Sequence, residues 1–169
     1  KDQEAVTPAQ AKTLAMCEVI MRKVQEIEDQ IRKLSEEEFA ELRDWVLEQD
    51  WSAWDAQIEA DAKAGKLDKL VAEAKAEYES VEPENFEAFA SDQFWALYNT
   101  LPRKVRELSD KNFALLRSDP RHPSLHFKRI GELWSVRAGL HYRALGIDVD
   151  EGIMWIWIGT HAEYDKLIR

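Results

Sequence analysis

The chain has 169 residues, enough for one domain or two small ones, and 45% hydrophobic content with seven Trp excludes a wholly disordered chain. Its longest apolar run, 153–158, is far too short to span a membrane, and its single cysteine, Cys17, excludes an internal disulfide. With a single cysteine, no secretion signal and no membrane span, we expect a cytoplasmic protein without a membrane partner, and its net charge is −10.

The net charge hides an asymmetry along the chain. Residues 1–90 carry 11 Lys and Arg against 23 Asp and Glu, whereas residues 91–169 carry 12 against 10. Within residues 103–143 there are 10 basic side chains and 4 acidic ones. Two halves of opposite sign either bind one another or form two unrelated solvated surfaces, and charge alone leaves both open.

The first periodic stretch, 17–34, has apolar residues at alternating spacings of three and four. These are Cys17, Ile20, Val24, Ile27, Ile31 and Leu34, with charged residues at most positions between them. Nearly three heptads of this kind predict one of two structures. One is an amphipathic helix packed on its own domain, and the other is a coiled coil that pairs two copies of the chain.

A second helix is predicted to begin at Glu36, because Ser35 and Glu38 have the spacing of a capping box. We expect this helix to stop near residues 49–50. A further helical stretch then runs to Gly65, a plausible C-terminal cap, and another covers residues 67–78.

Three tryptophans of this acidic half, Trp45, Trp51 and Trp54, need a surface to pack against. They either fill the core of a small helical domain or act as anchors on a partner. The acidic, proline-containing stretch 81–88 has no periodicity and predicts a linker. The chain therefore divides into a helical region, 1–80, and a second domain, 89–169.

The second domain is predicted to be α+β, with two helices packed on a small, mainly antiparallel four-stranded sheet. The helices are centred on residues 94–101 and 102–118, and the tail from residue 161 forms a short helix or an ordered end. The expected strands are 125–130, 133–138, 140–149 and 153–158. The last strand is apolar on both faces, as a central strand would be.

Basic side chains are threaded through these apolar strands at Lys128, Arg129, Arg137 and Arg143. Burying an unpaired charge is costly, so the pattern favours a sheet face that binds an anionic polymer. The sheet face on which Arg143 lies is left open, because strand alternation would place this charged side chain on the same face as the apolar Leu145. A bulge at Gly139 or Gly146 would re-aim it.

Four blocks of the second domain occur in an order that resembles the RelE/ParE superfamily of toxin–antitoxin toxins (HigB/RelE-like). They are HPSLHFK at 122–128, WSVR at 134–137, YRAL at 142–145 and WIGTHAEYD at 157–165. The resemblance covers about residues 89–168. A shorter stretch, 34–78, is similar to small helical antitoxins encoded beside such toxins, especially WDAQIE at 54–59 and AGKLD at 64–68.

In the ribonuclease branch of this family, the resemblance implies cleavage of messenger RNA on the ribosome, with no cofactor and no metal. Proton transfer would fall to His161 and Tyr164, with Asp165 orienting His161. The phosphate would be held and stabilised by Arg137 and Arg143, together with Lys128 and Arg129. Alternatively, His161 caps the last helix and Tyr164 packs against the sheet. In the ParE branch the same fold would inhibit DNA gyrase, without nuclease chemistry.

Toxin and antitoxin are usually separate chains, whereas this chain carries both resemblances. It is a natural fusion, an engineered single chain, or a toxin fold that has lost activity and serves as a dimeric, non-enzymatic interaction module. If the acidic helices fold over the sheet face at 128–143, their carboxylates would compete with RNA phosphate for the same cations. The partner of the toxin-like domain would then be the N-terminal half of its own chain.

Overall fold

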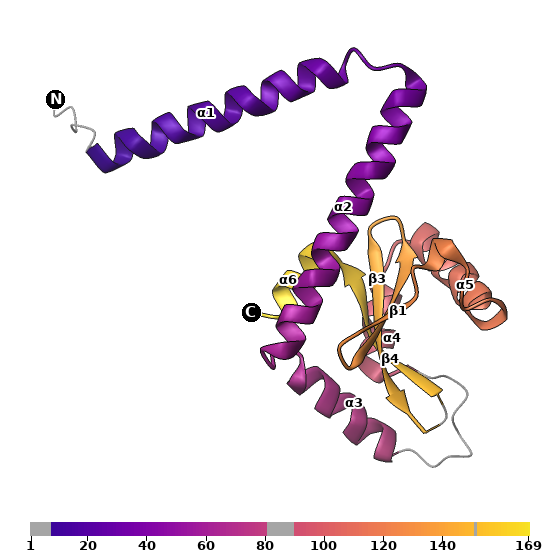
Figure 1. The fold of residues 1–169 in the computed structure, drawn as a ribbon. Helices are drawn as coiled ribbons and strands as arrows, with labels where there is room; N and C mark the ends of the chain where they lie inside the picture. Colours follow the sequence, from indigo (N-terminus) through magenta and orange to yellow (C-terminus); the bar gives the residue numbers. More distant parts are fainter. Residues whose placement is uncertain (1–7, 81–89, 151) are drawn as a thin grey trace. The chain divides into compact units, whose positions relative to one another are not determined.

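The computed structural model describes residues 8–80, 90–150 and 152–169. Over these residues the protein is α+β with a four-stranded antiparallel sheet, as predicted, and it has six α-helices (Figure 1). By their contacts the residues fall into two compact units, Lys1–Trp51 and Ser52–Arg169. The expected linker at 81–88 lies outside the described residues. None of the described helices is both long and apolar enough to cross a bilayer.

The first unit contains helix α1, Pro8–Ile31, and the beginning of helix α2, Glu36–Lys63. The predicted capping box at the start of α2 is confirmed. The Ser35 hydroxyl accepts from the Glu38 amide at 3.2 Å, and the Glu38 carboxylate accepts from the Ser35 amide at 2.8 Å. On α1, the seam residues Ile20, Val24 and Ile27 are exposed.

Helix α2 does not stop near residues 49–50, so that prediction was wrong. Neither glycine nor proline interrupts Glu36–Lys63, and therefore nothing in the sequence ends the helix earlier. It ends where Gly65 was expected to cap it, with φ of +74°. There the Lys66 amide donates to the Asp61 carbonyl at 3.0 Å, and the Gly65 amide to the Ala62 carbonyl at 3.1 Å. This pair of bonds is a Schellman motif.

Helix α3, Asp68–Ser80, follows and buries Leu70 and Ala74. The sheet comes after helices α4, Asp92–Thr100, and α5, Arg103–Ser118. Its strands β1, Lys128–Ile130, β2, Leu133–Gly139, β3, Tyr142–Val149, and β4, Gly152–Thr160, are hydrogen-bonded in that order.

Two strand predictions need correction. The first strand is shorter than expected, because Leu125 belongs to a 3-10 turn, Pro123–Leu125, rather than to β1. Strand β4 is at the end of the strand order and not in the centre, although it is buried on both faces as predicted. Its outer edge is partly occupied by Ala90, which forms a parallel bridge with Trp155.

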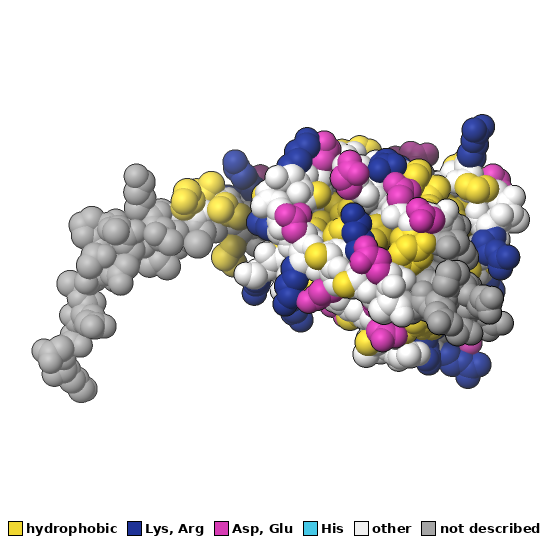
Figure 2. All heavy atoms as spheres, turned by 90° about the horizontal axis from the view of Figure 1, so that it is seen from below, with side chains coloured by type: hydrophobic (Ala, Val, Ile, Leu, Met, Phe, Trp, Pro, Cys, Tyr) yellow, Lys and Arg dark blue, Asp and Glu magenta, His cyan; other side chains and the backbone are white. Residues whose placement is uncertain are grey.

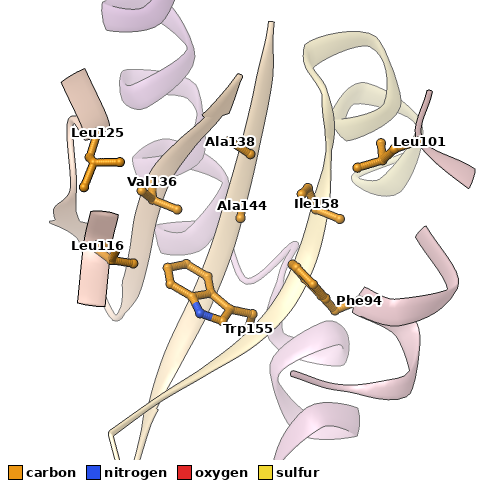
Figure 3. Close-up of a cluster of buried hydrophobic side chains, with 9 residues drawn as sticks. All are labelled: Phe94, Leu101, Leu116, Leu125, Val136, Ala138, Ala144, Trp155 and Ile158. Atoms are coloured by element: carbon orange, nitrogen blue, oxygen red, sulfur yellow. The ribbon is translucent and has the colours of Figure 1, made fainter. Parts of the chain in front are cut away.

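One face of the sheet, the helix-pair face, packs against α4 and α5. Its core comprises Phe94, Leu101, Leu116, Leu125, Val136, Ala138, Ala144, Trp155 and Ile158 (Figure 3). The start of α4 is fixed by Ser91, whose hydroxyl accepts from the Phe94 amide at 3.2 Å. The strand residues in this core point to the helix-pair face, and the residues that alternate with them point to the opposite face of the sheet.

The opposite face carries Arg143, and no bulge re-aims it. Strand register shifts do occur beside Gly139 and Gly146. Nevertheless β2 and β3 pair without interruption from Leu133 to Arg137, so Arg143 keeps the face of Leu145. We call this the arginine face. Residues 54–61 of α2 and helix α6, His161–Leu167, pack against it.

Candidate functional site

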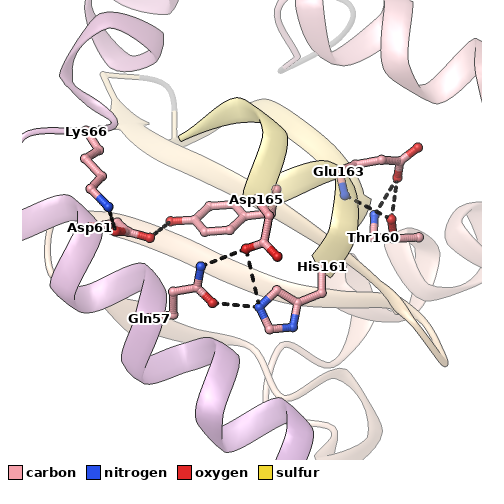
Figure 4. Close-up of polar contacts among 8 residues, drawn as sticks. Gln57, Asp61, Lys66, Thr160, His161, Glu163 and Asp165 are labelled. Atoms are coloured by element: carbon pink, nitrogen blue, oxygen red, sulfur yellow. Dashed lines mark hydrogen bonds and ion pairs between the residues drawn. The ribbon is translucent and has the colours of Figure 1, made fainter. Parts of the chain in front are cut away.

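Helix α6 presents three of the predicted site residues together. It is capped by Thr160, whose hydroxyl accepts from the Glu163 amide at 3.3 Å, while the Glu163 carboxylate accepts from the Thr160 amide at 2.7 Å. Because the helix starts at His161, the side chains of residues 161, 164 and 165 have the i, i+3 and i+4 spacing of one helix face. That face lies against α2 (Figure 4).

His161 and Asp165 are joined through Gln57 of α2. The Gln57 side-chain amide donates to Asp165 Oδ1 at 2.9 Å, and Gln57 Oε1 lies 2.7 Å from His161 Nε2 (Figure 4). The Nε2 atom must therefore carry the proton that Gln57 Oε1 accepts. The His161–Asp165 distance of 3.9 Å is too long for a hydrogen bond. In this structure it is Gln57 that directly orients both groups.

Tyr164 is fully buried, and its hydroxyl donates to Asp61 Oδ2 at 3.2 Å. The other Asp61 oxygen forms an ion pair with Lys66 at 2.8 Å (Figure 4). Burial raises the pKa of Tyr164, and the neighbouring Asp61 carboxylate raises it further. Tyr164 is therefore neutral at physiological pH, with its proton held towards Asp61.

Two of the predicted phosphate-binding cations meet at Asp55 of α2. One carboxylate oxygen pairs with Lys128 and the other with Arg143. The Arg143 side chain is only 3% exposed. Burial lowers the pKa of its guanidinium, and Asp55 opposes that change. Arg137 lies beside Arg143 as its cross-strand partner on β2. Lys128, Arg137 and Arg143 therefore lie on one face of the sheet, and α2 supplies an acidic partner, Asp55, for Lys128 and Arg143.

Arg129 is not part of this group. It pairs with Asp148 at 2.9 Å, and its guanidinium lies 5.7 Å from the centroid of the Trp134 ring. Strand alternation explains this position, because Arg129 follows Lys128 and so has the opposite parity. The structure brings Lys128 to the site and leaves Arg129 away from it.

The predicted tryptophan anchors differ in their surroundings. Trp45 is 60% exposed, Trp51 is buried, and Trp54 is 1% exposed. The Trp54 ring stacks on His161 with centroids 4.7 Å apart and planes 6° apart. The Arg143 guanidinium carbon also lies over this ring, 4.6 Å from its centroid. Trp54 is the anchor that reaches the site.

Sequence reasoning gave no role to three polar residues of α2 that touch the site, Asp55, Gln57 and Asp61. A signal was present, because Trp54 and Ile58 define a buried helix stripe and Asp55 and Asp61 flank it at helical spacing. Carboxylates beside a buried stripe indicate cationic partners. We refer to residues 54–61 as the covering segment.

On the face of the molecule drawn in Figure 2, acidic and basic side chains are interspersed among hydrophobic ones, so no patch of a single charge sign stands out there. Within the described ranges, His, Cys, Asp and Glu side chains form no group of three suited to a metal ion. No family model, curated protein or solved structure matches this chain.

Proposed function

We propose that residues 89–169 are a RelE-like toxin domain that cleaves messenger RNA on the ribosome, and that residues 1–80 are its antitoxin in the same chain. The proposal rests on the family resemblance and on one structural observation. The covering segment contacts the residues to which that resemblance gives phosphate binding and proton transfer, namely Lys128, Arg143, His161, Tyr164 and Asp165.

The contacts that two cations of the site already make support the proposal that the N-terminal region neutralises the toxin-like domain. A phosphodiester binds arginine and lysine through charge-assisted hydrogen bonds to its oxygens. Asp55 already engages Lys128 and Arg143 with its two oxygens. A carboxylate and a phosphate cannot hold the same donors together. RNA would therefore have to displace Asp55, and with it the helix turn that carries Asp55.

The proton-transfer groups are engaged as well. In RNA cleavage the 2′-oxygen attacks phosphorus and gives its proton to a base, while the P–O5′ bond breaks and the departing oxygen takes a proton from an acid. His161 and Tyr164 are our candidates for these two roles. In the covered state Nε2 of His161 donates to Gln57, and the Tyr164 hydroxyl donates to Asp61. Neither group is available to a substrate until the covering segment leaves.

The gyrase alternative needs no proton transfer. The clustering of His161, Tyr164, Lys128 and Arg143 favours the ribonuclease alternative, because an acid, a base and phosphate-binding cations are what that reaction requires. Gyrase inhibition would use the fold as a binding module and would leave this grouping unexplained.

A full-chain variant with a weakened cover tests the proposal. Trp54→Ala with Asp55→Ala, the opened variant, removes the stacked ring and the carboxylate. Trp45→Ala with Asp44→Ala is the matched control, because both side chains are exposed on the same helix. We expect the opened variant to arrest growth of bacterial cells and to shorten reporter messages, and the control and the unaltered chain to do neither.

Adding His161→Ala to the opened variant should restore growth if the ribonuclease assignment is correct. Normal growth of cells that contain soluble, folded opened variant would refute the toxin assignment. Growth arrest with intact messages would instead support gyrase inhibition.

The exposed seam of α1 supports a second proposal about partners, in which residues 17–34 pair two copies of the chain as a coiled coil. Ile20, Val24 and Ile27 keep heptad spacing and are exposed, although an apolar stripe is normally covered. The non-enzymatic alternative, a dimeric module with an inactive toxin fold, shares this dimer. It differs in predicting no growth arrest from the opened variant.

A further inference from the structure

Trp54 occupies a slot shaped for a planar ring. One wall is the His161 imidazole, nearly parallel to the indole, and the Arg143 guanidinium also lies over the indole. Trp157 and Tyr164 approach it edge-on, with centroids 6.4 Å and 6.1 Å away. Parallel stacking with an aromatic ring and contact with a guanidinium are interactions available to any planar π-system, including a nucleobase.

The next residue in the chain places an anion beside this ring. The two oxygens of Asp55 reach Lys128 and Arg143, much as the two non-bridging oxygens of a phosphodiester would. Arg143 contributes to both positions, because it pairs with the carboxylate and lies over the indole. A planar ring and a bidentate anion thus lie side by side, joined by a short stretch of backbone.

We propose that Trp54 and Asp55 mimic one nucleotide of single-stranded RNA, and that the slot which they fill is a base-and-phosphate subsite. This inference rests on the proposed function. When the covering segment leaves, a base stacks on the face of His161 and its neighbouring phosphate binds Lys128 and Arg143. Stacking tolerates every base, so the subsite holds RNA in place with little sequence preference.

The subsite gives His161 two separable contributions. Its ring face carries the base, while Nε2, at the ring edge, is directed to a hydrogen-bonding partner, here Gln57. A stacked base and a proton transfer at Nε2 are therefore geometrically compatible. His161→Phe should keep the stacking platform and lose the proton, whereas His161→Ala should lose both.

Fluorescence anisotropy of a labelled adenosine trinucleotide at low salt tests the subsite in the full-length chain. We expect the opened variant to bind it at least about tenfold more tightly than the unaltered chain or the Trp45→Ala, Asp44→Ala control. Within the opened variant, His161→Phe should preserve binding, whereas His161→Ala should weaken it about tenfold. A trinucleotide backbone without bases should bind as weakly to the opened variant as the intact probe binds to His161→Ala.

Two results would overturn the subsite: a folded opened variant that binds no better than the unaltered chain, or equal binding of the probes with and without bases. If the opened variant does not fold, the two single variants test the base position and the phosphate position separately. Trp54→Ala should gain binding of adenosine, and Asp55→Ala should gain binding of ribose 5-phosphate but not of adenosine. No gain in either single variant would also overturn the subsite.

The subsite and the proposed function fail in different assays. Base-dependent RNA binding with normal cell growth would leave the subsite intact and refute the toxin. Growth arrest with message loss, but without base-dependent binding, would retain the toxin and refute the mimicry.

Discussion

Replacing Trp54 with alanine is expected to lower the free energy of unfolding of Ser52–Arg169 by about 4 kcal/mol. An aromatic side chain of this kind buries roughly 200 Å², which at roughly 25 cal/mol per Å² gives an upper value near 5 kcal/mol. Part of that area stays buried by the alanine, while the lost contact with Arg143, 4.6 Å from the ring centroid, adds up to about 2 kcal/mol. Measured Trp-to-Ala losses in cores, about 3–5 kcal/mol, agree with this range.

The comparison variant is Trp45→Ala, in which the same atoms are removed from a side chain that is 60% exposed. Its expected change is within about 0.5 kcal/mol. Urea unfolding followed by far-ultraviolet circular dichroism measures both variants without relying on tryptophan emission. If the loss for Trp54→Ala exceeds that for Trp45→Ala by less than about 1 kcal/mol, stacking against His161 and Arg143 does not hold the covering segment in place.

Three further predictions concern individual groups and the first helix. Because the folded-state pKa of Tyr164 is raised, its contribution to stability is complete below the unfolded value of about 10 and declines as pH rises above it. Urea midpoints should therefore fall less between pH 9 and pH 11 in Tyr164→Phe, and an unchanged slope would contradict this. Nitrogen NMR should find His161 protonated at Nε2, and in Gln57→Leu this preference should weaken; an Nδ1–H form in the unaltered chain would refute the assigned network. Sizing of the intact chain and of a chain lacking residues 1–34 should give a dimer and a monomer, and two monomers would exclude the coiled coil.

Local sequence signals predicted much of the fold because each acts within a few residues. The Ser35–Glu38 capping box and the Gly65 cap depend on neighbouring atoms alone, and both are present where expected. The helix stop expected near residues 49–50 was wrong, because the two polar residues there do not end a helix. Without glycine or proline, and with Trp54 buried further along, the helix continues.

The site could be predicted only in part, because its geometry depends on contacts more than 60 residues apart in the chain. The family resemblance singled out Lys128, Arg143 and three residues of α6, and the structure brings these residues together around α2. Which polar groups of α2 would meet them could not be derived, since helical spacing defines a face but not its partner. The position of Arg143 was left open for a similar reason. Its strand alternation was regular, but the carboxylate that makes its burial tolerable, Asp55, comes from another element.

The covering segment is part of one continuous helix, and this determines how the site is released. Trp54, Asp55, Gln57 and Asp61 project from about two consecutive turns, whose backbone hydrogen bonds link each residue to the one four positions before it. The four side chains therefore leave together, through a single cooperative opening, rather than one at a time. Their backbone amides should exchange with solvent at one shared free energy. Each 1.4 kcal/mol removed from that free energy raises the population of open molecules about tenfold. Under the proposed function, the ribonuclease activity of the chain would therefore rise exponentially as heat or mutation weakens the helix.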